Sequence, residues 1–279
     1  MTVRPQDDDD LARIFAELTL EAGAAVMRVQ ASGPKARIKK DSSPVCDADL
    51  FAEAVILEGL VHYVPDLPVV AEELCANGDV PKLDGGPFIL VDPLDGTREF
   101  LEGRDCFSVN IALIRDGAPV VGAVFAPGRG ELYLAGSRAW TAATTSGGKL
   151  PPRTAWKEMH TRKMPERDVI ALASRSHRDS DTDRLLARLP LKKVVPIGSS
   201  LKFCLIAAGK ADVYPRFGPT REWDIAAGDA VLRRAGGAVL DLSGAPVVYG
   251  RTARAFANDP FVAWGDPAAA AQFHAAGIC

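Results

Sequence analysis

The sequence predicts an α/β protein of two lobes. Two long helical patterns come first, a series of short apolar runs joined by tight turns follows, and the second half alternates between strand and helix patterns. A stretch rich in Gly and Pro separates the halves and marks a boundary between lobes. We place the N-terminal lobe at residues 1–150 and the C-terminal lobe at residues 151–279.

Two amphipathic helices begin the chain. Apolar residues from Leu11 to Val29 recur at helical spacing after an acidic run, and they predict a helix over residues 9–30. The same spacing returns over residues 47–63, after a polar stretch that contains Gly33 and Pro34. We therefore expect two helices before the first strand.

A meander of strands follows the helix pair. Short apolar runs predict strands at 69–71, 88–91, 107–114, 120–125 and 131–135. Asp116-Gly117 and Pro127-Gly128 supply turns between the last three. Residues 137–166 lose all periodicity, so we expect an irregular connection there.

The second lobe alternates strands with helices from Asp168 onward. Apolar runs predict strands at 169–172, 193–196, 211–214 and 238–240. Helical spacing predicts helices at 181–189, 200–208 and 224–235. This order is typical of an α/β unit.

Charge and composition exclude several classes of protein. The 279 residues include 36 acidic and 33 basic side chains, and the formal net charge of -3 provides no basic surface for nucleic acid. The five cysteines form no C-x-x-C pair, which favours a reducing compartment. Because the sequence has neither a signal peptide nor about 18 consecutive apolar residues, we expect a cytoplasmic protein without a transmembrane segment, with peripheral inner-membrane association as an alternative. Nothing in the sequence indicates an obligate protein partner.

The segment DPLDGT at residues 92–97 follows directly after an apolar strand. Its carboxylates, Asp92 and Asp95, are expected to point into a crevice at the end of that strand. Pro93 is expected to stop the strand's hydrogen-bond ladder, and Gly96 permits a tight turn. If a helix begins there, its first N–H groups face an anion. A solvated turn is the alternative for this motif alone.

Two further acidic clusters occupy similar places. Glu72 and Glu73 follow the strand at 69–71, and Asp224 opens a helix. Taken singly, the first pair is a loop start and the second a helix cap. Together with DPLDGT, these acids would repel one another unless cations lie among them. All-oxygen ligands suit Mg²⁺, Mn²⁺ or Ca²⁺ rather than zinc, and few carboxylates beside a substrate phosphate favour Mg²⁺.

Other catalytic motifs are incomplete. A Walker loop that ends at Gly148 and Lys149 would need Gly where Ala143 stands and Ser or Thr where Leu150 stands. A nucleophile elbow at Ser200 would need Gly in place of Lys202.

The motifs together resemble the signature of the magnesium-dependent, lithium-sensitive phosphatases that include inositol monophosphatase and fructose-1,6-bisphosphatase. Glu72-Glu73, DPLDGT, Trp223-Asp224 and Gly236-Gly237 carry the resemblance in this order. The segments SRSH at 174–177, IGSSLKFC at 197–204 and YPRFGPT at 214–220 are similar to the CysQ-type 3'(2'),5'-bisphosphate nucleotidases.

The resemblance implies the sugar-phosphatase fold, a sandwich of alternating α/β/α/β/α layers in which both lobes form one catalytic unit. It implies hydrolysis of 3'-phosphoadenosine 5'-phosphate to AMP and phosphate in sulfur assimilation, with 3'-phosphoadenosine 5'-phosphosulfate as a further substrate. Two or three Mg²⁺ ions would act during turnover, Mn²⁺ would be an alternative, and Li⁺ would inhibit.

The same resemblance implies roles for single residues. The metal ligands would be Glu72, Asp92, the Leu94 carbonyl, Asp95 and Asp224. Asp49 and the Thr97 hydroxyl would activate the attacking water. The residues in contact with substrate would be Glu72, Asp95, Gly96, Thr97, Arg98, His177, Ser199, Lys202, Arg216 and Asp224. Of these, Lys202 and Arg216 would face the second phosphate.

The chain departs from the family pattern in three places that concern the site. Cys46 stands where Thr is frequent, Asp47 stands where an uncharged residue is usual and changes the setting of Asp49, and Arg98 stands where Lys is frequent. Two other functions stay open. An inositol or sugar phosphate monoesterase would use the same metal site, and a non-catalytic nucleotide- or metal-binding sensor would be expected to lack Asp49 or Thr97.

Overall fold

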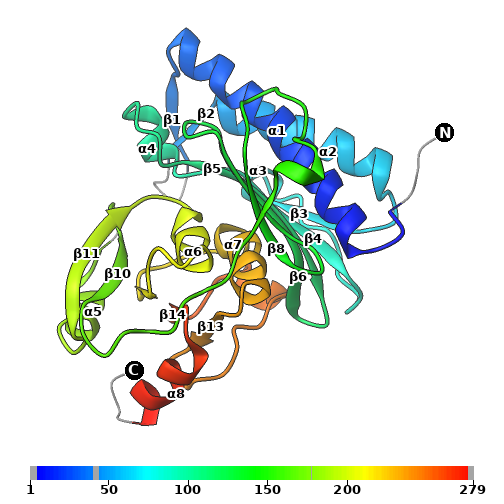
Figure 1. Ribbon diagram of the computed structural model, residues 1–279. Helices are drawn as coiled ribbons and strands as arrows, with labels where there is room; N and C mark the ends of the chain where they lie inside the picture. Colours follow the sequence, from blue (N-terminus) through cyan, green and yellow to red (C-terminus); the bar gives the residue numbers. More distant parts are fainter. Residues whose placement is uncertain (1–4, 40–43, 177, 276–279) are drawn as a thin grey trace.

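Helical and β layers alternate through the molecule (Figure 1). The computed structural model describes residues 5–39, 44–176 and 178–275. A seven-stranded and a five-stranded sheet form the β layers, and three hydrophobic clusters fill the spaces between sheets and helices. The predicted α/β/α/β/α order is confirmed.

The seven-stranded sheet has the order β3-β4-β5-β6-β7-β8-β9. Its strands are β3 (Val69–Ala71), β4 (Phe88–Asp95), β5 (Ser108–Arg115), β6 (Ala118–Ala126), β7 (Glu131–Ala135), β8 (Ala139–Ala143) and β9 (Lys157–Glu158). β3 and β4 are parallel, and the later neighbours are antiparallel. The predicted meander is confirmed.

The last two strands correct the expectation of an irregular connection over residues 137–166. β8 is short and β9 consists of two exposed residues, so neither shows the apolar alternation that marks a strand in a sequence. The large sheet thus takes strands as far as Glu158, and the lobe boundary at residue 150 stays a prediction.

α1 (Asp8–Ser32) and α2 (Asp47–Tyr63) lie side by side over one face of the large sheet (Figure 1). Both predicted helices are confirmed, α2 at its predicted bounds. Between them, β1 (Ala36–Ile38) pairs with β2 (Pro44–Cys46). The expectation of no strand before residue 69 is therefore wrong. All of β1 is exposed, so no apolar pattern marks it.

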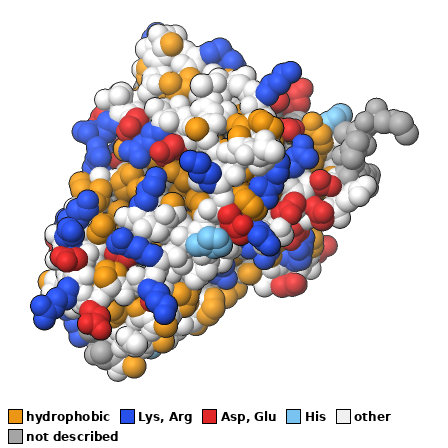
Figure 2. Space-filling view, viewed as in Figure 1, with side chains coloured by type: hydrophobic (Ala, Val, Ile, Leu, Met, Phe, Trp, Pro, Cys, Tyr) orange, Lys and Arg blue, Asp and Glu red, His pale blue; other side chains and the backbone are white. Residues whose placement is uncertain are grey.

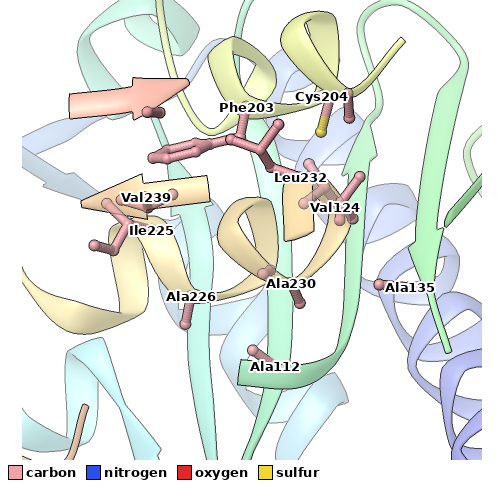
Figure 3. Close-up of a cluster of buried hydrophobic side chains, with 14 of the residues drawn as sticks. Ala112, Val124, Ala135, Phe203, Cys204, Ile225, Ala226, Ala230, Leu232 and Val239 are labelled. Atoms are coloured by element: carbon pink, nitrogen blue, oxygen red, sulfur yellow. The ribbon is translucent and has the colours of Figure 1, made fainter. Parts of the chain in front are cut away.

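α6 (Leu201–Ala207) and α7 (Glu222–Arg234) lie between the two sheets. Figure 3 shows Ala226 and Ala230 of α7 in the same buried cluster as Ala112 and Val124 of the large sheet. These small side chains let the helix approach the sheet closely.

The five-stranded sheet has the order β11-β10-β12-β14-β13. Its strands are β10 (Val169–Ser174), β11 (Leu191–Ile197), β12 (Val213–Arg216), β13 (Ala238–Asp241) and β14 (Phe261–Trp264). α5 (Ser180–Leu186) and α8 (Pro267–Ala275) pack on its outer face. The strands and helices predicted for this half are confirmed with small shifts at their ends, whereas β14 and α8 were not predicted.

Two short helices start where neighbouring strands of the large sheet end. α3 (Glu72–Ala76) follows β3, and α4 (Thr97–Leu101) follows β4. Short 3₁₀ turns occur at Arg153–Ala155 and Thr252–Arg254. Because β3 and β4 are parallel, their carboxyl ends bring the acidic motifs to the same edge of the sheet.

Surface charge is mixed in sign. Figure 2 shows basic and acidic side chains interspersed with hydrophobic ones over the visible face, in keeping with the near-balanced charge of the chain. Across the described ranges, no helix combines the length and the apolar character needed to cross a membrane.

The contact between β6 and α7 generates a prediction about stability. A Cβ atom on Gly122 would lie 2.8 Å from the Ala227 carbonyl oxygen and 2.9 Å from the Ala230 Cβ. Gly122→Ala should therefore lower the free energy of unfolding by about 1–3 kcal/mol, as measured by urea denaturation. Gly86→Ala, in an exposed loop, is the control and should change the free energy of unfolding by less than about 0.5 kcal/mol. Equal effects of the two substitutions would contradict this account of the contact.

Candidate active site

The DPLDGT segment forms the end of β4. The expectation that Pro93 stops the ladder is wrong, because β4 continues to Asp95. Its pairing with β5 shifts between Asp92, which lies opposite Asn110, and Asp95, which lies opposite Ser108. This bulge places Pro93 where the ladder needs no N–H donor.

Gly96 turns the chain from β4 into α4. Its φ of 94° lies in the left-handed region, which glycine adopts without strain. Thr97 begins α4, and its Oγ1 lies 3.2 Å from the Leu94 carbonyl oxygen and 3.2 Å from Asp49 Oδ1. The single hydroxyl proton thus has two acceptors, one on the strand and one on α2.

Asp49 is buried in the first turn of α2. Its Oδ2 accepts the Cys46 N–H at 2.8 Å and the Cys46 thiol at 3.1 Å. Burial raises the pKa of Asp49, and the bonds from Cys46 oppose this rise. Burial and the charge of Asp49 raise the pKa of the Cys46 thiol to about 12, so the thiol stays protonated and can donate. The departure from the family pattern at Cys46 therefore leaves Asp49 anchored.

Glu72 and Glu73 begin α3 beside a half-buried lysine, Lys39. Lys39 Nζ lies 2.7 Å from Glu72 Oε1 and 2.5 Å from Glu73 Oε1. Burial would lower the pKa of Lys39, but the two carboxylates together raise it above its ordinary value. A positive charge is thus already held against Glu72.

Asp224 lies in the first turn of α7. Its Oδ2 accepts the N–H of Arg221, the residue before the helix, at 2.8 Å. The capping role considered for Asp224 is therefore present. Asp224 also lines a cavity together with Glu72 and Asp95, so its capping role leaves it free to act as a metal ligand as well.

One cavity of about 230 Å³ brings most of the predicted site residues together. Those that line it are Glu72, Asp95, Gly96, Thr97, Arg98, Ser199, Lys202, Arg216 and Asp224. Asp49, Asp92 and Leu94 are buried, and the Thr97 hydroxyl and the DPLDGT chain link them to the cavity. His177 lies outside the described residues.

Lys202 and Arg216 form the basic end of this cavity, and their exposed fractions are 5% and 6%. Lys202 Nζ donates to the Ser199 carbonyl at 2.5 Å, and Arg216 Nη2 donates to the Pro219 carbonyl at 2.8 Å. Burial lowers the pKa of Lys202 to about 8, with Asp95 opposing the decrease and Arg216 adding to it. Two fixed cations therefore face an acidic end.

The acidic end has the chemistry of a divalent-cation site. Burial raises the pKa of Asp92 well above its ordinary value, and the charges of Glu72 and Asp95 add to the rise. Burial also raises the pKa of Asp95 to about 6 and, with repulsion from Asp95, that of Asp224 to about 8. A bound cation would relieve this repulsion, and oxygen donors suit Mg²⁺.

The carboxylates nevertheless stand apart. Within the described part of the chain, no three Asp, Glu, His or Cys side chains converge as a metal-binding group. Glu72 is already paired with Lys39. The ligand set stays a prediction.

Two serines at the site were not predicted to be site residues. Ser200 joins two predicted ligands, because its N–H donates to Asp95 Oδ2 at 2.5 Å and its Oγ to the Asp224 carbonyl at 2.6 Å. Ser176 Oγ donates to Glu99 Oε1 at 2.9 Å and so connects the segment after β10 with α4. Local sequence held no signal for these contacts, since each joins segments far apart in the chain.

The chain matches the model of the inositol monophosphatase family over residues 7–276, and it belongs to that family. It is 41% identical over 236 residues to the 3'(2'),5'-bisphosphate nucleotidase CysQ of Escherichia coli strain K12, a match that covers 84% of this chain and 91% of that protein. The enzyme of the same name from Buchnera aphidicola is 36% identical over 253 residues, with coverage of 89% and 91%.

Solved structures agree with this assignment. The crystal structure of CysQ from Bacteroides thetaiotaomicron superposes with a TM-score of 0.77 at 32% identity, covering 91% of this chain and 96% of that one. Inositol monophosphatase from Anabaena sp. PCC 7120 shares the fold, with a TM-score of 0.70 at 22% identity and coverage of 95% and 92%. The resemblance drawn from the motifs is confirmed.

Repulsion among the buried acids generates a prediction about pH. The folded protein holds Asp224 with a pKa of about 8, far above the value in the unfolded chain. Because the unfolded chain loses this proton near pH 4 and the folded chain near pH 8, stability of the metal-free protein should fall as pH rises through this range, by about 3 kcal/mol between pH 5.5 and 8. Asp224→Asn should flatten this slope, because Asn stays neutral and still accepts the Arg221 N–H.

Urea denaturation in EDTA across this pH range measures the slope. Saturating Mg²⁺ should flatten it for the wild type, because the ion favours the ionised carboxylates. Parallel slopes for wild type and Asp224→Asn would show that Asp224 does not carry the effect.

Proposed function

We propose that this protein is an Mg²⁺-dependent 3'(2'),5'-bisphosphate nucleotidase that converts 3'-phosphoadenosine 5'-phosphate to AMP and phosphate. The observation that carries the proposal is a single cavity with a carboxylate-lined end and a buried cationic end. The names of its CysQ relatives support the substrate class. 3'-Phosphoadenosine 5'-phosphosulfate presents the same 3'-phosphate and an anionic 5' group, so it is a second substrate of this site.

The acidic end would hold Mg²⁺. The predicted oxygens come from Glu72, Asp92, Asp95, Asp224 and the Leu94 carbonyl. When bound, Mg²⁺ stabilises charge on the phosphoryl oxygens and lowers the pKa of water. The Leu94 N–H donates to Asp92 Oδ1 at 3.1 Å and so fixes that carboxylate.

Thr97 and Asp49 would form the proton-transfer pair. The Thr97 hydroxyl can pass its proton to Asp49 Oδ1, 3.2 Å away, as its oxygen accepts a proton from the attacking water. Because Cys46 binds Oδ2, the other oxygen faces Thr97. Burial raises the pKa of Asp49, which makes this carboxylate a stronger base.

Lys202 and Arg216 would bind the phosphate that is not hydrolysed. Charge-assisted hydrogen bonds to phosphate are strong at buried positions, because the surroundings screen them weakly. Gly96, Thr97 and Arg98 line the part of the cavity where the reacting phosphate would lie.

A comparison of two substrates tests this function. With Mg²⁺ present, kcat/KM for 3'-phosphoadenosine 5'-phosphate should exceed that for inositol 1-phosphate by at least about a hundredfold, because only the nucleotide offers a second phosphate to the basic end. Lys202→Ala should reduce this preference. Equal or inverted values in a phosphate-release assay would overturn the nucleotidase assignment and favour a sugar phosphate monoesterase.

The titration of Lys202 generates a second test. Lysine binds phosphate when charged, so kcat/KM for the bisphosphate should fall above pH about 8, approaching tenfold per pH unit. Lys202→Arg should shift this fall to higher pH, because arginine stays protonated. With adenosine 3'-phosphate, which lacks the second phosphate, kcat/KM should not show this fall. A wild-type profile that stays level to pH about 9.5 would contradict the role of Lys202.

A further inference from the structure

Glu53 lies on the buried face of α2, one helical turn after Asp49. Its exposed fraction is 5%. Its Oε2 accepts the Glu73 N–H at 2.8 Å, and its Oε1 accepts the Leu74 N–H at 3.0 Å. One carboxylate on α2 therefore binds two consecutive backbone donors of α3.

α3 has no cap of its own. The residue before it is Ala71, whose side chain offers no acceptor, and the first N–H groups of a helix have no partner inside the helix. Glu53 supplies the missing acceptors from another helix. The direction in which α3 leaves β3, and with it the position of Glu72, is therefore set by α2.

The chemistry of Glu53 matches these donors. An ionised carboxylate offers two acceptor oxygens, whereas a glutamine amide offers one acceptor and presents protons at its other end. Burial raises the pKa of Glu53 to about 7, and the charge of Glu72 adds to the rise.

We propose that Glu53 is a positioning residue that holds α3 so that Glu72 faces the cavity in a set position relative to Asp49. Asp49 and Glu53 are four residues apart, so one face of α2 orients both the proposed base and a proposed metal ligand. This inference rests on the proposed function, in which the acidic end holds Mg²⁺.

Glu53→Gln tests the proposal through metal binding without substrate. Titration calorimetry with Mg²⁺ alone should give a dissociation constant about tenfold higher than that of wild type, as is typical when a partner of a metal ligand is removed. At saturating Mg²⁺, kcat should stay within about threefold of wild type, because Asp49 and Thr97 are unchanged. Glu58→Gln, on the exposed side of the same helix, is the matched control and should bind Mg²⁺ as wild type does.

Glu53→Asp is the second variant. It keeps two acceptor oxygens but is shorter by one methylene, so its Mg²⁺ affinity should lie between those of wild type and Glu53→Gln. Should Glu53→Gln fail to fold, this variant decides: weakened Mg²⁺ binding supports the proposal, and wild-type binding overturns it. Wild-type Mg²⁺ affinity together with a lowered Tm in Glu53→Gln would likewise overturn it, because Glu53 would then serve the fold alone.

Failure of this proposal can be told apart from failure of the proposed function. Wild-type protein that binds Mg²⁺ but releases no phosphate from the bisphosphate overturns the nucleotidase assignment. Unchanged Mg²⁺ affinity in Glu53→Gln, with wild-type activity intact, overturns only the role of Glu53.

Discussion

The repulsion among carboxylates buried around one cavity is the constraint on which the rest of the structure depends. Backbone donors hold three of them: Leu94 N–H binds Asp92, Ser200 N–H binds Asp95, and Arg221 N–H binds Asp224. Such bonds favour the ionised form, yet burial still raises the pKa of each acid. Basic side chains partly offset this repulsion, because Lys39 contacts Glu72 and Lys202 lowers the pKa of Asp95.

The layers bring these groups together from separate parts of the chain. Parallel β3 and β4 deliver Glu72 and the DPLDGT segment at one edge of the large sheet. α7 enters between the sheets because small residues such as Gly122 allow its close approach, and its first turn adds Asp224. The residue before α6, Ser200, bonds to Asp95 and to the Asp224 carbonyl. The helix that carries Lys202 is therefore tied to two of the acids that would hold the metal.

Elements with a regular apolar pattern could be predicted from the sequence, and elements without one could not. α2 and β3 were predicted at their observed bounds, α2 because its buried residues recur at helical spacing and β3 because it is a short apolar run. β1 is wholly exposed and α8 is largely alanine, so neither carries a contrast between two faces. The residues of the site also fall into a group that the sequence reveals and a group that it does not. Acids at strand ends could be found from motifs, whereas Lys39 could not, because its partners lie 33 and 34 residues away.

The sequence by itself determined the family, the order of most helices and strands, and the residue types available for catalysis, because these are written in consecutive residues and short motifs. Only the tertiary structure decided which donors satisfy each buried acid, how Pro93 fits within β4, and that Glu53 caps α3. The physical reason is that these properties depend on neighbours in space. The pKa of a buried carboxylate reflects every charge and hydrogen-bond donor around it, and those groups come from segments that meet only when the layers pack.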